Sequence, residues 1–127
     1  MLINYNSPDD IDMLFDMCTR FPCLRTLVLF GSHTKFSESL EEISELLEAA
    51  CFRYDGKVRI RKCYDALTAE FENGSLITVT VAREGVRGLR AHIVEYETCI
   101  EDDILHNVVR PIAREYDIIH YKEKPAR

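Results

Sequence analysis

Apolar side chains recur at helical spacing in two stretches of the chain, with polar side chains between them. The first stretch predicts a helix over Pro8–Phe21, because Ser7 can cap it and Pro8 suits the first helical position. The second predicts a helix that follows a loop over Gly31–Ser37 and ends near Cys51. Glutamates fill the polar side of this second helix, which predicts that this side faces solvent.

Continuous or alternating apolar runs predict the strands. Arg25–Phe30 is apolar throughout its second half, which is typical of an inner strand covered on both faces. Further strands are expected over Lys57–Cys63, Leu67–Glu72, Leu76–Ala82 and Ala91–Glu97. Between two of these runs stands Asn-Gly, which predicts a tight hairpin turn.

The last element is a helix that opens at Thr98-x-x-Glu101, a pattern similar to a capping box, and that Pro111 should kink or split. No strand is expected ahead of the first helix. The predicted order is therefore α-β-α-β-β-β-β-α. Residues 1–127 are expected to form a single α/β domain with a mixed central sheet and flanking helices.

Composition fits this picture of an ordinary globular domain, with 46% hydrophobic and 30% charged residues. No apolar run approaches the length of a membrane span, and the N-terminus lacks the pattern of a signal peptide. A cytoplasmic protein is expected, and the Met1 start with a polar end favours a complete chain. The odd number of cysteines argues against a disulfide framework, and their spacing gives zinc little support. We expect buried thiols instead.

Charge is unevenly distributed along the sequence. The net charge of −6 does not favour a dedicated DNA-binding surface. Acidic residues are dense over Glu38–Glu48 and Glu95–Asp103, and basic residues over Lys57–Lys62 and Arg83–Arg90. Such runs are usually solvated faces. The alternative is an acidic face that occupies a basic surface of a partner.

Several short motifs occur in a fixed order between residues 73 and 111. An Asn-Gly-Ser turn leads into a strand, the loop Arg87-Gly88-Leu89-Arg90-Ala91 follows, and the next strand ends in acid at Glu95 and Glu97. A helix with Val-Arg-Pro comes last. This series resembles the large (ATPase) subunit of tailed-phage terminases. The resemblance implies an ATPase-type core in which the strands Arg25–Phe30 and Ala91–Glu97 lie side by side and parallel.

The residues that hold phosphates in that family are missing. The sequence has no G-x-x-x-x-G-K-S/T, the motif whose amides and lysine surround the phosphates. Adjacent Asp-Glu is also absent, so Glu95 or Glu97 alone would take the magnesium-binding position. Hydrolysis of ATP by this chain alone is therefore not expected, and no catalytic residue is assigned.

A second phosphate-site pattern lies after the first strand. Leu-Phe-Gly31-Ser32 is similar to the start of the nucleotidyltransferase signature, and Lys35 follows it. That family continues with aspartates at D-x-D spacing that bind magnesium, whereas this chain has glutamates in a predicted helix. A turn into a capped helix is the favoured interpretation, with nucleotide binding by Gly31, Ser32 and Lys35 as the alternative.

Two classes of function follow from the sequence. The first is a non-catalytic, phage-type binding protein without cofactor that inhibits or regulates a host or phage protein, as anti-CRISPR proteins do, with a homodimer as one allowed form. The alternative is a nucleotide-binding or DNA-packaging ATPase component that uses magnesium and ATP and needs a partner to supply the P-loop. In either class Arg83, Arg87, Gly88 and Arg90 are candidate contacts to the partner or to DNA.

Overall fold

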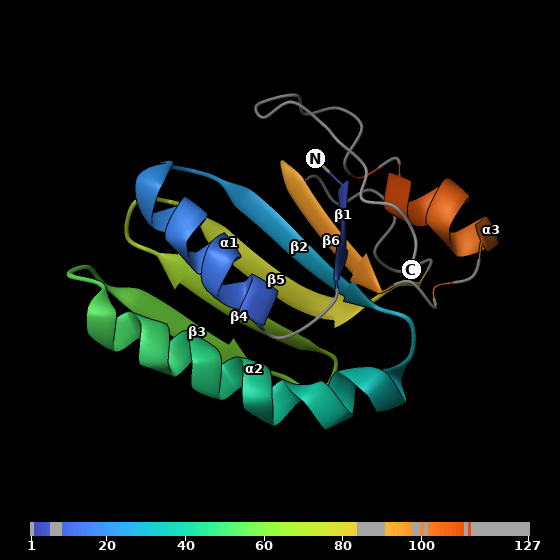
Figure 1. The fold of residues 1–127 in the computed structure, drawn as a ribbon, viewed down its shortest axis with the longest axis horizontal. Helices are drawn as coiled ribbons and strands as arrows, with labels where there is room; N and C mark the ends of the chain where they lie inside the picture. Colours follow the sequence, from blue (N-terminus) through green and yellow to red (C-terminus); the bar gives the residue numbers. More distant parts are fainter. Residues whose placement is uncertain are drawn as a thin grey trace.

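The computed structural model is an α/β domain built around one mixed sheet (Figure 1). It describes residues 2–5, 9–83, 91–97, 100, 102–110 and 112. The described part of the chain contains a 6-stranded sheet in the order β1-β6-β2-β5-β4-β3. The strands are β1 (Leu2–Tyr5), β2 (Arg25–Phe30), β3 (Val58–Lys62), β4 (Ala66–Phe71), β5 (Leu76–Val81) and β6 (Ile93–Glu97). The predicted fold class is confirmed.

The sheet has a parallel half and an antiparallel half that meet at β5. Strands β1, β6, β2 and β5 run parallel, so their carboxyl ends share one edge of the sheet. Strands β3 and β4 run antiparallel and form the other border. The expected parallel pairing of β2 with β6 is confirmed, with Val28 opposite Glu95.

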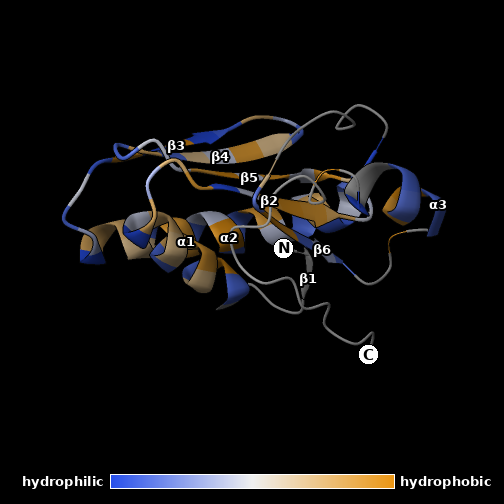
Figure 2. Cartoon of the chain, turned by 90° about the horizontal axis from the view of Figure 1, so that it is seen from above, coloured by the Kyte–Doolittle hydropathy of each residue, from blue (hydrophilic) through white to orange (hydrophobic). Residues whose placement is uncertain are grey.

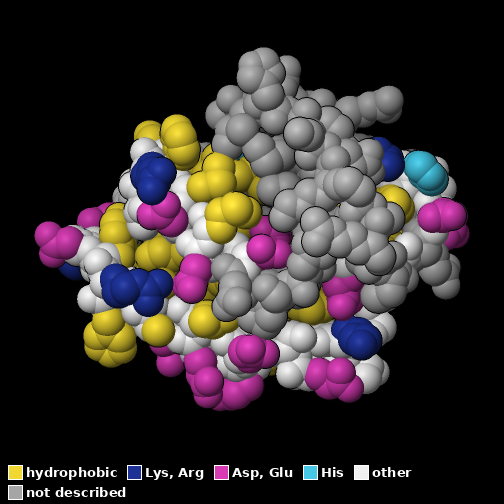
Figure 3. Space-filling view, viewed as in Figure 1, with side chains coloured by type: hydrophobic (Ala, Val, Ile, Leu, Met, Phe, Trp, Pro, Cys, Tyr) yellow, Lys and Arg dark blue, Asp and Glu magenta, His cyan; other side chains and the backbone are white. Residues whose placement is uncertain are grey.

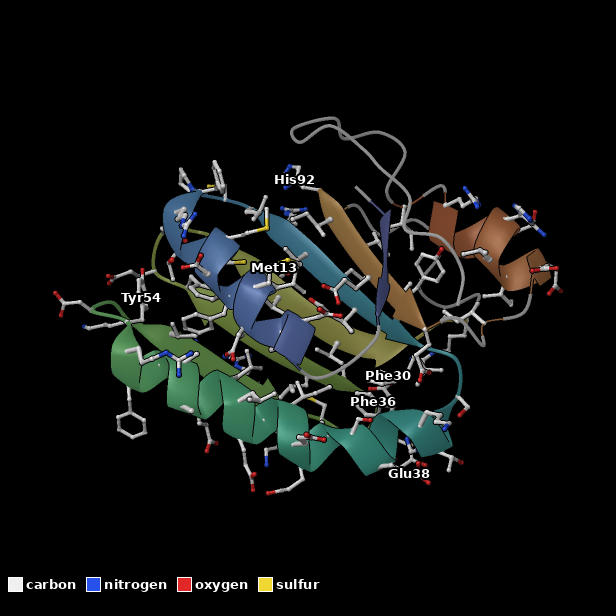
Figure 4. The ribbon with its side chains drawn as sticks, in the orientation of Figure 1. Met13, Phe30, Phe36, Glu38, Tyr54 and His92 are labelled. Carbon is white, nitrogen blue, oxygen red and sulfur yellow. The ribbon has the colours of Figure 1, made fainter. Side chains whose placement is uncertain are left out.

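Helices α1 (Asp9–Arg20) and α2 (His33–Arg53) cover one face of the sheet (Figure 2). Their buried sides meet alternate residues of β2, β4 and β5 in one hydrophobic cluster. Phe36 at the start of α2 packs on Phe30 at the end of β2, with ring centroids 6.2 Å apart (Figure 4). The apolar spacing of both helices therefore serves to close this face of the core.

A second, smaller cluster covers the opposite face over β2 and β6. It contains Leu27 and Leu29 of β2 and Val94 and Tyr96 of β6. The helical segment after β6, α3 (Asp102–Ile104) followed by a π-helical turn over Leu105–Val109, packs Ile104 and Leu105 against it. Because β2 is covered on both faces, its residues from Thr26 to Phe30 are buried, as the apolar run predicted.

Among the described residues, no helix lies over the face of β3, β4 and β5 that points away from α1 and α2, which we call the open face (Figure 2). Burial alternates along β4 and β5, with Leu67, Ala69, Ile77 and Val79 buried towards the helices. Thr68 and Thr78, which face each other across these strands, are half-buried on the open side. The period of two in the sequence therefore separates a helix-covered face from a polar one.

The Asn73-Gly74-Ser75 turn joins β4 to β5 and also holds the loop that leads into β2. Gly74 has a φ of +90°, which favours glycine, and an added Cβ would lie 2.8 Å from Cys23 Sγ. The Ser75 hydroxyl donates to the Phe21 carbonyl at 2.6 Å and accepts from the Leu24 N–H at 3.0 Å. The predicted hairpin is confirmed.

The same turn anchors the end of α1. The Asn73 side-chain amide donates to the Cys18 carbonyl at 2.8 Å, and its oxygen accepts from the Ser75 N–H at 2.9 Å. The Cys23 N–H donates to the Asn73 carbonyl at 3.2 Å. The Asn-Gly-Ser motif is thus a structural tie between two loops far apart in the sequence.

Two expectations about the first half of the chain were wrong. A strand, β1, precedes the first helix, so the element order begins with β rather than α. It forms because β6 offers a parallel partner, with Ile3 opposite Glu95. The expected loop over Gly31–Ser37 is shorter, because α2 already begins at His33. The predicted capping box at Thr98 and Glu101, and the kink at Pro111, lie outside the described residues.

Candidate functional site

The carboxyl ends of β2 and β6 bring together residues from two of the sequence motifs. Gly31 and Ser32 follow β2, and Glu97 ends β6 beside them. The Gly31 N–H donates to Glu97 Oε1 at 2.7 Å. In α/β sheets, ligands bind outside the carboxyl ends of the parallel strands, so this edge is the first place to look for a site.

Ser32 is the N-cap of α2, and its side chain closes the first turn of the helix. Its backbone is extended, and its hydroxyl accepts from the Lys35 N–H at 3.2 Å. The Ser32 carbonyl accepts from the Phe36 N–H at 3.1 Å. The interpretation of this motif as a turn into a capped helix is confirmed, and the Lys35 side chain projects from an exposed position in the first turn.

The Glu97 carboxylate already accepts the hydrogen bond from the Gly31 N–H that a bound phosphate would accept. Helix N-termini and the amides before them attract anions, because the N–H groups and the helix dipole carry partial positive charge. Here the anion is a side chain of the same chain, held on the Gly31 N–H. Phosphate binding by Gly31 and Ser32 would require Glu97 to leave this position and would meet its negative charge.

Glu95 lies one step back along the same face of β6 and is fully buried at 0% exposure. It sits opposite Val28 of β2 on one side and Ile3 of β1 on the other. Glu97 reaches the edge of the sheet, whereas Glu95 stays inside it. In the described part of the chain no three histidine, cysteine or acidic side chains come together as a metal-binding group.

Arg83, at the end of β5, is held by an ion pair. Its Nη2 lies 2.9 Å from Asp65 Oδ2, and the Thr80 hydroxyl donates to the Asp65 carbonyl at 2.7 Å. This fixes Arg83 beside the loop between β3 and β4. Arg87, Gly88 and Arg90 lie outside the described residues.

An aromatic pair near this arginine was not expected from the sequence. The His33 and Tyr64 rings stack with centroids 4.6 Å apart and an interplanar angle of 28°. The Tyr64 side chain is 84% exposed, and the next residue is the Asp65 that holds Arg83. No local pattern signals this contact, because the two residues belong to separate elements.

The cysteines divide into two classes. Cys18 is buried in the core, and burial raises its pKa to about 12, against a smaller lowering by a hydrogen bond with Thr26. Burial also raises the pKa of half-buried Cys51, and nearby Glu48 adds to the effect. Cys23 and Cys63 are exposed, so the expectation of buried thiols was wrong for these two. All four are free thiols, and Cys99 lies outside the described residues.

The outer side of α2 carries an acidic surface that we call the glutamate face. It consists of five exposed residues, Glu38, Glu41, Glu42, Glu45 and Glu48. Acidic side chains line this edge of the molecule in Figure 3, and Glu38 points away from the sheet in Figure 4. At the end of the helix Phe52 is 92% exposed, the most exposed of the large apolar side chains described.

No protein-family model, curated protein or solved structure matches the chain. Within the described residues, no helix has both the length and the apolar character that crossing a bilayer requires.

Proposed function

We propose that this chain is a non-catalytic binding protein that inhibits or regulates a partner protein by placing the glutamate face of α2 on a basic surface of that partner. The partner is a host or phage protein. The terminase-like motifs and the small acidic chain agree with a phage-type regulator of the kind that anti-CRISPR proteins represent, acting in the cytoplasm. The observation that carries the proposal is the glutamate face itself.

The charges of this face are almost entirely uncompensated within the described residues. Only Glu41 has an ion pair there, at 3.8 Å to Lys62 Nζ. The glutamates stand three or four positions apart on one helix, where each like-charge pair costs about 0.2 to 0.5 kcal/mol. Burial of Ile43, Leu47 and Ala50 on the opposite side holds the helix in place despite this repulsion. A basic partner surface would convert the repulsion into attraction.

Phe52 adds an apolar contact at the end of the same helix. An isolated exposed apolar residue is common on protein surfaces, but aromatic side chains surrounded by charge frequently anchor interfaces. Phe52 lies one helical turn after Glu48, between half-buried Cys51 and exposed Arg53. The proposed interface therefore combines one aromatic anchor, Phe52, with the charged side chains of the glutamate face.

The test is capture of partners from host lysate by three matched proteins, with mass spectrometry of what binds. Wild type is expected to retain a partner that Glu42→Lys with Glu45→Lys loses and that Phe52→Ala binds more weakly. Asp102→Lys with Asp103→Lys makes the same change in net charge at α3 and should retain the partner. An identical set of captured proteins for wild type and the α2 double variant would refute the proposal.

The second candidate is a nucleotide-binding or ATPase component whose partner supplies the P-loop. It is favoured by the position of Gly31, Ser32 and Glu97 at the carboxyl ends of adjacent parallel strands. It is opposed by the Glu97 carboxylate on the Gly31 N–H. Calorimetry with ATP and magnesium separates the two proposals. We expect no heat of binding, and a saturable, magnesium-dependent signal would favour the second candidate.

A further inference from the structure

We infer that the free edge of β3 binds an extended acidic segment of another protein, which adds to the sheet as a seventh strand. This edge lies at the border of the antiparallel half (Figure 1), and its Lys62 pairs with Glu41 of the glutamate face at 3.8 Å. Among the described strands β3 pairs with β4 alone, so its other side has no strand beyond it. The inference is independent of the proposed role of α2.

The register shows which main-chain groups point outward. The Lys57 carbonyl accepts from the Glu72 N–H at 3.0 Å, and the Cys63 N–H donates to the Ala66 carbonyl at 2.7 Å. Hydrogen-bonded pairs alternate in an antiparallel ladder, so the residues between these ends also alternate. The N–H and C=O groups of Val58, Ile60 and Lys62 therefore point away from β4, in the arrangement that an added strand requires.

Two arginines stand beside this edge on the open face of the sheet. Arg59 and Arg61 are exposed, and they alternate with Val58 and Ile60, which are half-buried towards the helices. Neither arginine has an ion pair among the described residues. In the register with β4, Arg59 lies opposite Glu70 and Arg61 lies opposite Thr68, so Arg61 has no acidic residue directly across from it.

Charge selects an acidic segment over a second copy of the chain. If two copies of β3 paired antiparallel about Ile60, Arg59 of each copy would lie opposite Arg61 of the other. Like charges directly opposite each other destabilise a strand pair. A segment with Asp or Glu two residues apart places a carboxylate opposite each arginine instead.

An added strand would lie in the plane of the sheet on the outer side of β3, where no described strand stands. Its side chains on the open face would lie beside Arg59 and Arg61, and no described helix lies above that face (Figure 2). A hollow of about 750 Å³ at the start of β3 is lined in part by Arg59 and Glu70. A side chain at one end of the added segment can enter this hollow.

The experiment uses the full chain as bait for a displayed library of random nine-residue peptides. We expect enrichment of sequences with Asp or Glu at every second position, and fluorescence anisotropy with the enriched peptide gives its Kd. Arg59→Glu with Arg61→Glu should raise this Kd by about tenfold or more. Arg20→Glu with Arg53→Glu makes the same charge change on the helices and should alter it less than about twofold.

A proline variant tests the strand pairing itself. Ile60→Pro removes an N–H that points outward and leaves the bonds to β4 in place, so it should weaken peptide binding strongly. Because Ile60 also packs on the core, Lys62→Pro provides the same removal at an exposed position, with circular dichroism to check folding.

The inference is overturned if no peptide is enriched, if acidic residues lack the two-residue spacing, or if the arginine variant binds as wild type does. Self-association that β3 substitutions abolish would also overturn it, since the edge would then serve a second copy. These outcomes leave the glutamate face untouched, so the two proposals fail separately.

Discussion

The two ends of the parallel strands use polar residues in different ways. Where β2 and β5 begin, Asn73 and Ser75 are bonded to main-chain groups, and the turn is fixed. Where β2 and β6 finish, charged and exposed side chains gather around Gly31, Glu97 and Arg83. The Asn73-Gly74-Ser75 turn is therefore a structural tie, and Gly31, Ser32 and Arg83, the described candidates for contacts, stand at the opposite end of these strands.

The strongest test of this comparison is Ser75→Ala. The Ser75 side chain is almost fully buried and bonds the Phe21 carbonyl and the Leu24 N–H. Removing it leaves the buried Leu24 N–H without its acceptor, so we expect a loss of about 2 kcal/mol in the free energy of unfolding. Urea denaturation measures it. A loss below about 0.5 kcal/mol would show that this end is not a structural tie.

At the carboxyl ends of β2 and β6, Glu97→Ala is expected to lower the free energy of unfolding by less than Ser75→Ala does. The bond from the Gly31 N–H lies at an exposed site, so the loss should be about 0.5 to 1 kcal/mol. Because the variant frees an amide before a helix N-terminus, inorganic phosphate should restore part of its stability and leave wild type unchanged. Thermal melts with and without phosphate make the measurement. A loss equal to that of Ser75→Ala would remove the distinction between the two ends.

The smallest effect concerns pH at the start of the strands. His92 Nδ1 accepts from the Arg25 N–H at 3.0 Å, and burial followed by the Arg25 charge lowers the pKa of His92 from 6.5. Its contribution to stability is present above pH 6.5 and is lost as pH falls through the lower pKa of the folded state, because the unfolded chain takes up the proton first.

Denaturation midpoints between pH 7.5 and 5 test this for wild type and for His92→Asn. Asparagine offers an oxygen to the same N–H and does not titrate. The stability of the variant should therefore decline less with falling pH than that of wild type. Parallel pH profiles of the two proteins would contradict the assignment.

Local patterns in the sequence were sufficient to predict the elements whose structure depends mainly on their own residues. The apolar run of β2, the alternation of β4 and β5 and the Asn73-Gly74 turn each appear within a short window of sequence. Strand β1 was missed because it is short and its partner in the described sheet, β6, lies about ninety residues further along.

The candidate site was less accessible to sequence analysis for a related reason. Gly31 and Glu97 were each singled out, but the bond between them depends on β6 lying beside β2. The His33–Tyr64 stack likewise joins separate elements. The glutamate face and the basic run of β3 were visible as charge runs, whereas their exposure and the Glu41–Lys62 pair between them follow only from the fold.

The place of β6 between β1 and β2 has a consequence for how the sheet forms during synthesis. β6 is the last strand synthesised among those described, yet it lies between β1 and β2, and β1 pairs with no other described strand. Strand β1 therefore leaves the ribosome long before β6, its partner in the described sheet, is synthesised. Such long-range closure slows folding and makes it cooperative. A nascent chain that stops short of residue 93 leaves β1 without its described partner and β2 at a sheet edge, whereas the β5-β4-β3 end is already complete.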